Sequence, residues 1–185
     1  KNPKSNMHQN LYLAMVAGRV VPASGAWRDH LIKRREGHRV RVAVSRGGRP
    51  NAELRYAVED AATGRPRGDA GAGRAPQVPF SMLRIELVTG RTHQIRVHLA
   101  HKGHPVFGDS DYGGRRGPLL RLTPSRRAEA ALLLAELDHQ ALHAETLGFR
   151  HPATGDPMEF TRPVPLDFEA VLTAHAGGHL GHDLE

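Results

Sequence analysis

Four consecutive side chains near the middle of the sequence carry hydrogen-bond donors that could bind an anion. They are Arg91, Thr92, His93 and Gln94, and Arg96 follows one turn later if the segment is helical. A strand, a glycine turn and a helix start would place unpaired backbone N–H groups and the positive end of the helix dipole here. Such donors suit a phosphate, a ribose or the edge of a base. The simpler alternative is that both arginines are ordinary surface or salt-bridged residues.

The elements that would position these side chains begin with a set of short strands. Residues 82–88 alternate between apolar and charged side chains, which is typical of a half-buried strand. Residues 39–44 and 54–59 alternate in the same way. Residues 11–16 are apolar apart from Tyr12, which indicates a strand with both faces covered. We therefore expect an α+β fold with a mixed, largely antiparallel central sheet, flanked by helices and loops.

A helix is expected directly after the donor segment, over about residues 93–102. Gly103, a residue typical of a helix C-terminus, ends it. At 3.6 residues per turn, Ile95 and Leu99 fall on one face of this helix and Arg96 falls on the opposite face. The pattern therefore predicts that Arg96 points away from the apolar anchor of the helix.

The later part of the chain is expected to form one more helix and a hairpin. Thr123 as the cap and Pro124 at the first helical position predict a helix that runs to about Leu137. Residues 142–149 and 158–161 predict two strands joined by a turn.

The length of the chain fits a single domain, because domains cluster at roughly 100–200 residues. We assign residues 1–168 to this domain. Residues 61–79, rich in glycine, proline, alanine and arginine, are expected to form a mobile loop inside it. Residues 169–185 are expected to form a C-terminal tail, which frays among histidines and glycines near its end.

Composition points to a polyanionic partner and excludes several classes of protein. The net charge is +7, and only four of the 26 basic residues are lysines. Arginine fits phosphates and base edges well, which favours nucleic acid, although a compositional bias of the genome would give the same excess. The absence of cysteine excludes disulfides and thiolate metal sites. No apolar run is long enough to span a bilayer, so we expect a soluble, cytoplasmic protein.

Several motifs occur in an order that is similar to the RluA family of pseudouridine synthases. Residues 89–98, TGRTHQIRVH, and residues 103–113, GHPVFGDSDYG, resemble the third motif region of that family. Residues 11–20, LYLAMVAGRV, resemble its tyrosine strand, and residues 141–168 resemble its closing hairpin and the end of its domain. The resemblance covers residues 11–168, which is most of the chain.

This resemblance implies an RNA-modifying isomerase. Such an enzyme breaks the N-glycosidic bond of a uridine, turns the uracil in its pocket and forms a carbon–carbon glycosidic bond. The resemblance assigns Tyr12 to the active-site tyrosine that packs on the flipped base, and Arg96 to the arginine that pairs with the catalytic aspartate. It implies an RNA partner, ribosomal or transfer RNA, contacted through residues 91–94. It implies no cofactor, metal or membrane, and it leaves the oligomeric state undetermined, with a monomer slightly favoured.

One motif of the family does not occur in these 185 residues. The catalytic aspartate belongs to a His-Arg-Leu-Asp sequence, which is absent here. The opening Lys-Asn-Pro-Lys resembles what usually follows that motif, so we expect the motif immediately upstream of residue 1. Two alternatives stay open. One is a catalytically inactive RNA-binding module, and the other is a basic scaffold with a coincidental motif.

Other chemistry is considered for the same region. His98, His101 and His104 are spaced by three residues and could form a metal pair, but no H-E-x-x-H pattern accompanies them. Asp109 and Asp111 could act as an acid pair in hydrolysis, but the resemblance places them in a structural loop near the site. Outside the resemblance, Tyr12 would be interpreted as a core tyrosine and Arg96 as a surface arginine.

Overall fold

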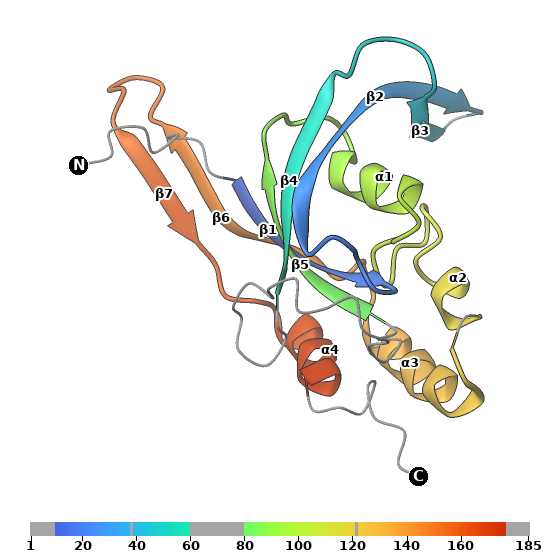
Figure 1. Ribbon diagram of the computed structural model, residues 1–185. Helices are drawn as coiled ribbons and strands as arrows, with labels where there is room; N and C mark the ends of the chain where they lie inside the picture. Colours follow the sequence, from blue (N-terminus) through green and yellow to red (C-terminus); the bar gives the residue numbers. More distant parts are fainter. Residues whose placement is uncertain (1–9, 38, 60–79, 121, 177–185) are drawn as a thin grey trace.

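A seven-stranded sheet forms the centre of the computed structural model, which describes residues 10–37, 39–59, 80–120 and 122–176 (Figure 1). The strand order is β3-β2-β4-β5-β1-β6-β7, and all neighbouring strands are antiparallel. The expected fold class is confirmed, and the sheet is antiparallel throughout. The expected loop at 61–79 lies outside the described residues. The strands are β1 (Asn10–Ala17), β2 (Ser24–Glu36), β3 (Arg39–Ser45), β4 (Ala52–Glu59), β5 (Phe80–Leu87), β6 (Leu142–Arg150) and β7 (Pro157–Thr161).

Helices cover opposite faces of this sheet. Along β5, Leu83 and Ile85 point to one face and pack with α1 (Gln94–His101), whereas Phe80 and Met82 point to the other. That second face packs against α3 (Pro124–Glu136) and α4 (Leu166–Ala176). A short helix, α2 (Arg116–Leu119), precedes α3. No helix in the described part of the chain is both long and apolar enough to cross a membrane.

Most elements agree with the sequence patterns. The predicted strands correspond to β1, β3, β4, β5, β6 and β7, and the predicted helices to α1 and α3. The α3 helix has Thr123 as its N-cap residue and Pro124 in its first turn, as predicted. The short helix α2 was not predicted.

The strand β2, of 13 residues, was not predicted from the sequence. Its stretch from Arg28 to His30 contains three polar residues in succession, so the alternation that marks a strand is broken. The strand is stabilised by pairing with two different strands. Residues 24–29 pair with β4, and residues 30–36 pair with β3. The outer half of β2 therefore forms a hairpin arm with β3 that extends beyond the central sheet (Figure 1).

The helix α4 continues past residue 168, where we expected a tail to begin. Phe168 and Val171 are 1% and 0% exposed and belong to the core cluster under β5. The helix was not predicted because it follows a proline-rich segment and has apolar residues on more than one side. Only residues 177–185 of the expected tail lie outside the described part of the chain.

A tight loop links α1 to α2 and has no room for a side chain at Gly114. A Cβ atom there would lie 1.7 Å from the Val106 carbonyl oxygen and 2.8 Å from the Asp109 backbone nitrogen. Both are backbone atoms, so the obstruction cannot be relieved by turning a side chain. The loop is closed by the Gly114 N–H, which donates to the Asp109 carbonyl at 2.7 Å.

We predict that Gly114→Ala destabilises the protein by about 3 kcal/mol, the upper end of the cost of overpacking, because backbone must move. Urea denaturation followed by circular dichroism measures this loss. Gly117→Ala is the matched control, because a Cβ at Gly117 meets no atom within 4 Å. Equal stabilities of the two variants would contradict the packing argument.

Candidate functional site

Arg96 lies in α1 and is held by two carboxylates of the following loop. Its Nε and Nη2 atoms donate to the two carboxylate oxygens of Asp109 at 2.8 and 2.7 Å, and Nη2 also donates to Asp111 at 2.8 Å. This paired geometry is the strongest form of an arginine–carboxylate contact. It leaves Nη1 without a partner among the described residues. The guanidinium is therefore fixed in direction and keeps one free nitrogen.

Asp109 is the buried anchor of this group. The residue is 0% exposed, and its Oδ1 atom also accepts the backbone N–H groups of Asp111 and Tyr112 at 3.0 and 3.1 Å. The Asp111 side chain is 45% exposed, and its hydrogen bond from Arg96 lowers the pKa of that carboxyl. The hydrogen bonds that Arg96 donates to Asp109 in turn raise the pKa of Arg96. Both carboxylates act here as supports for the arginine, in agreement with the structural-loop interpretation.

Tyr112 connects this loop to α1 and to the hairpin arm. Its ring lies 4.9 Å from the Arg96 guanidinium carbon, a cation–π distance. Its hydroxyl lies 2.9 Å from Nδ1 of His93 and accepts the backbone N–H of Val42, in β3, at 3.3 Å. His93 has a left-handed backbone with φ of 53°, an uncommon conformation for a residue other than glycine. The start of α1 is thus fixed through side chains.

Gln94 has a structural role in this arrangement. The residue is 2% exposed, its Nε2 donates to the Glu53 carbonyl at 2.9 Å, and its Oε1 accepts from the Thr89 hydroxyl and the Arg91 N–H. Both polar atoms of its amide therefore make hydrogen bonds within the protein. Of the four donor side chains considered in the sequence, Gln94 is therefore the one that faces inwards.

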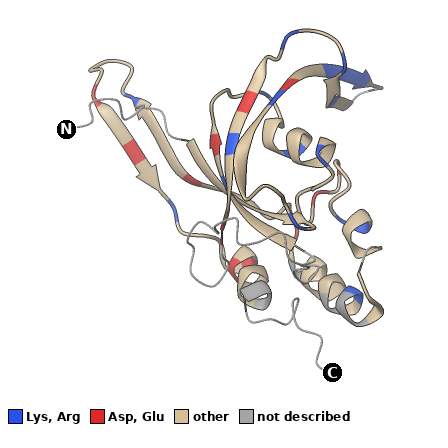
Figure 2. Ribbon diagram, viewed as in Figure 1, with Lys and Arg blue, Asp and Glu red and all other residues tan. Residues whose placement is uncertain are grey.

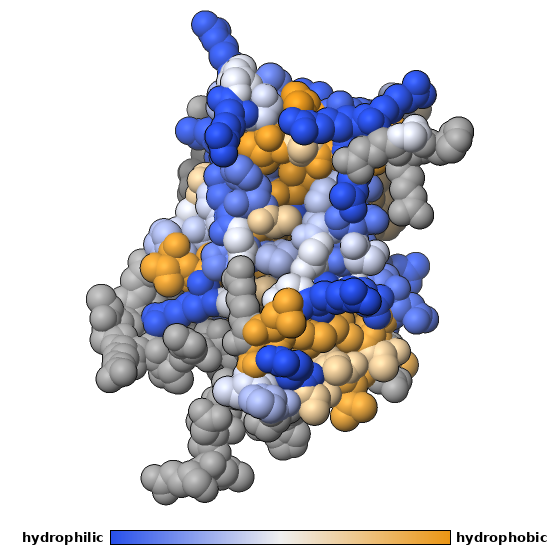
Figure 3. All heavy atoms as spheres, turned by 90° about the vertical axis from the view of Figure 1, so that its right-hand side faces the viewer, coloured by the Kyte–Doolittle hydropathy of each residue, from blue (hydrophilic) through white to orange (hydrophobic). Residues whose placement is uncertain are grey.

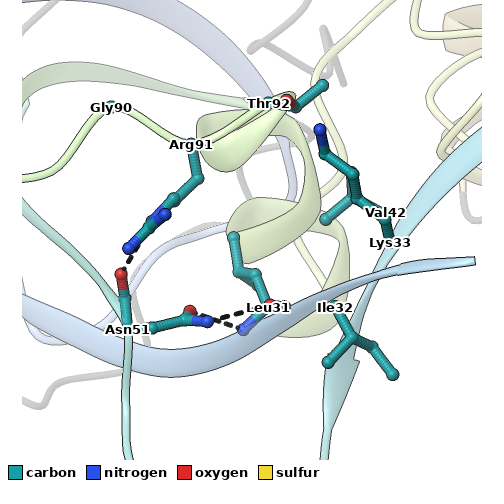
Figure 4. Close-up of a pocket in the computed structure, with 8 residues that line it drawn as sticks. All are labelled: Leu31, Ile32, Lys33, Val42, Asn51, Gly90, Arg91 and Thr92. Atoms are coloured by element: carbon teal, nitrogen blue, oxygen red, sulfur yellow. Dashed lines mark hydrogen bonds between the residues drawn. The ribbon is translucent and has the colours of Figure 1, made fainter.

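Arg91 and Thr92 are exposed and line a pocket between the start of α1 and the hairpin arm (Figure 4). Arg91 Nε donates to the backbone carbonyl of Asn51 at 3.1 Å. Asn51 itself exchanges two hydrogen bonds with the backbone of Leu31 in β2. No sequence pattern indicated the contribution of Asn51 or β2, because β2 itself was not predicted.

Tyr12 lies on the same face of the sheet as α1. It is partly buried at the edge of the cluster that contains Ile95 and Leu99 of α1. Its strand neighbours are Ile85 on one side and Ala144 on the other. Arg96 instead contacts the loop after α1, so the structure places the two residues on one side of the sheet with different neighbours.

The histidines considered as a metal pair are separated by their environments. His98 is 0% exposed, and its nearest ionic neighbour is Asp29 at 3.8 Å, whereas His104 Nδ1 lies 2.9 Å from the Ala17 carbonyl. In the part of the chain that the structure describes, no three histidine or acidic side chains are grouped so that they could hold a metal ion.

Comparisons with known proteins give a consistent result. A solved structure titled "Human RNA Pseudouridylate Synthase Domain Containing 4" has a TM-score of 0.57 and 17% identity to this chain. The alignment covers 92% of this chain and 62% of the chain in that structure. This likeness defines the class of fold. A family model described as RNA pseudouridylate synthase matches residues 2–101, more than half of the chain. The chain belongs to this family, which confirms the RluA-type resemblance.

Two curated relatives match this chain over part of their own length. "Ribosomal large subunit pseudouridine synthase D" of Haemophilus influenzae is 45% identical over 107 residues, which cover 57% of this chain and 32% of the relative. An "Uncharacterized RNA pseudouridine synthase" of Chloroflexus aurantiacus is 38% identical over 164 residues, which cover 89% of this chain and 41% of the relative. The chain thus spans less than half the length of these two relatives.

We predict that Asp109→Asn lowers the free energy of unfolding by about 3 kcal/mol, because it breaks one partner of a buried ion pair. Asp111→Asn should cost less than about 1 kcal/mol, because that carboxylate is largely exposed. Guanidinium denaturation of the two variants measures the difference. Equal losses would show that Asp109 is not the principal anchor of Arg96.

We also predict a pH-dependent stability that depends on His98. Burial lowers its pKa below the ordinary value of 6.5, with Lys102 and His101 adding to the effect and Asp29 opposing it. The unfolded chain then takes up a proton that the folded protein does not, so this contribution is complete above about pH 6.5 and is lost as the pH falls towards the folded pKa.

Urea denaturation of wild type and His98→Gln at about pH 7.5 and about pH 5.5 measures this contribution. The wild type should lose more stability on acidification than His98→Gln. His101→Gln, on the exposed side of the same helix, should behave as the wild type does. If His98→Gln and the wild type lose the same amount, His98 does not carry the effect.

Proposed function

We propose that this chain forms part of an enzyme that isomerises uridine to pseudouridine in large-subunit ribosomal RNA. The observation that carries the proposal is the family match over residues 2–101, which includes both Tyr12 and Arg96. The Haemophilus influenzae relative is named a ribosomal large subunit pseudouridine synthase, which supports ribosomal RNA over transfer RNA as the substrate. We also propose a cytoplasmic location, because the enzyme and its RNA must meet.

Arg96 is proposed to orient the catalytic carboxylate. That carboxylate belongs to the His-Arg-Leu-Asp motif, which the 185 residues do not contain. Asp109 holds the guanidinium through Nε and Nη2, and Nη1 stays available to a further acceptor. A carboxylate bound at Nη1 would be kept ionised by the positive charge, as a nucleophile or a stabiliser of the sugar cation requires.

Tyr12 is proposed to pack against the target base. The uridine must first leave its stack, at a cost of a few kcal/mol, and an aromatic ring offers it a new surface. Tyr12 is partly buried on the α1 face, so its ring is held in place while part of it stays accessible. The reaction rearranges bonds within one nucleotide and needs no cofactor.

RNA is proposed to run along the basic side of the molecule. Figure 2 shows lysine and arginine on the outer end of β2, in the connection from β3 to β4, and on α1. Arg91, Thr92 and His93 lie next to this region, and we assign contacts with the RNA to them. Gln94 supports them from the interior. Such contacts make affinity depend on salt, because each bound phosphate releases counterions.

A tritium-release assay tests the proposal. A fusion of this chain behind a segment with the His-Arg-Leu-Asp motif is incubated with ribosomal RNA labelled at uridine C5. Attachment of C5 to the ribose expels that hydrogen, so release reports the reaction. We expect release by the fusion and a loss of at least about a hundredfold in Arg96→Ala, the range for removing a positioned electrostatic group.

Tyr12→Phe separates the two contributions of the tyrosine in the same assay. It should keep RNA affinity and lower the rate if the hydroxyl takes part in proton transfer, and it should leave both unchanged if only the ring acts. Arg150→Ala, in the β6–β7 hairpin, is the control for loss of an arginine elsewhere. No release by a folded fusion that binds RNA would contradict the proposed activity.

The second candidate function is an inactive RNA-binding module. The observation that favours it is the missing aspartate motif. Filter binding and tritium release together separate the two candidates. RNA binding without release, in the fusion as well as in the chain alone, would support the module.

A further inference from the structure

A pocket of about 320 Å³ lies between the hairpin arm and the start of α1. This volume is at the lower end of the range for small-ligand sites, about 300–1,000 Å³, and so suits a ligand of about one nucleotide. Tyr12 and Arg96 do not line it, so it is separate from the proposed catalytic position. The lining residues, drawn in Figure 4, are Leu31, Ile32, Lys33, Val42, Asn51, Gly90, Arg91 and Thr92.

The floor of the pocket is apolar and firmly packed. Leu31 and Val42 are 7% and 5% exposed and form a core cluster with Val97 of α1 and Ala52 of β4. Figure 3, which views this side of the molecule, shows a hydrophobic area bordered by hydrophilic side chains in its upper part. The exposed part of these apolar side chains can contact the face of a base that has left its stack.

The rim of the pocket is cationic. Lys33 has no ion-pair or hydrogen-bond partner among the described residues. Among the same residues, the Arg91 side chain is bonded only through Nε, to a backbone carbonyl. Thr92 adds a hydroxyl, and none of the eight lining residues is acidic. Two cations with no carboxylate beside them favour a phosphate at the rim.

We propose that this pocket binds one unstacked nucleotide of a single RNA strand, with its base on the Leu31–Val42 floor and its phosphate between Lys33 and Arg91. The inference rests on the proposed RNA-binding function. A strand, in preference to a free nucleotide, is indicated because further lysines and arginines lie on the outer end of β2 and in the connection from β3 to β4 (Figure 2), which flank the lining residues Lys33 and Asn51. Described cations in these flanks are Arg34, Arg35, Arg46 and Arg49.

The charge part of the proposal is tested with Lys33→Gln and its neighbour Arg34→Gln. The two residues adjoin in β2, and the alternation of a strand points Arg34 away from the pocket face. Binding of a short fluorescein-labelled oligouridine is followed by anisotropy over a range of salt concentrations. Affinity falls as salt rises, and Lys33→Gln should make the plot of log affinity against log salt less steep by about 0.7, the value for one phosphate on a single strand. Arg34→Gln should change the steepness less.

The shape part is tested with Gly90→Leu. A Cβ at Gly90 meets no atom within 4 Å, so the variant should fold while its side chain reduces the space of the pocket. Gly117→Leu is the matched control, because Gly117 in α2 has equally open surroundings and does not line the pocket. Gly90→Leu should weaken oligouridine binding about tenfold and leave binding of the oligouridine–oligoadenosine duplex unchanged.

The outcomes separate this proposal from the proposed function. Binding of oligouridine by the wild type, with Gly90→Leu equal to Gly117→Leu, overturns the pocket and leaves the RNA-binding function standing. Equal losses for the single strand and the duplex also overturn it, since an unstacked base is then not required. Absence of RNA binding by the wild type overturns both. Tighter binding of uridine monophosphate than of oligouridine would replace the strand by a free nucleotide.

Discussion

The ion pair between Arg96 and Asp109 is the contact on which the described site depends. Its two hydrogen bonds join α1 to the loop that follows it, and the backbone bonds of Asp109 then fix Asp111 and Tyr112. A buried pair of this kind contributes little net stability compared with apolar packing, since desolvation offsets much of the attraction. Its value here is geometric, because it gives one guanidinium a single direction. The orienting role proposed for Arg96 requires that property.

The central sheet, α1 and the hairpin arm together position the residues on this side of the molecule. The strands carry Tyr12 on a rigid surface, and α1 lies on the same face through Ile95 and Leu99. Lys33 of the hairpin arm and Arg91, which are far apart in the sequence, line the same pocket. Two positions, one proposed for catalysis and one for a further nucleotide, therefore share a single supporting helix.

Sequence patterns predicted the parts of the fold that are locally determined. Residues 82–88 alternate because one face of β5 is buried, and Thr123 with Pro124 marks the start of α3. The pairing of Arg96 with Asp109 was not predictable, because 13 residues separate them and only the closed loop at Gly114 brings them together. Gln94 shows the opposite error. Its amide suggested a ligand contact, but the carbonyl of Glu53, distant in sequence, occupies it.

The two halves of β2 pair with different strands, which affects how the length of the hairpin arm can change. Among the strands, residues 30–36 pair only with β3, so their hairpin shares no ladder with β4. Two residues added on each side of the tip, near Gly37, would lengthen the arm by further strand pairs and leave the register of the inner strands intact. The length of this arm can therefore change in evolution independently of the sheet that carries Tyr12.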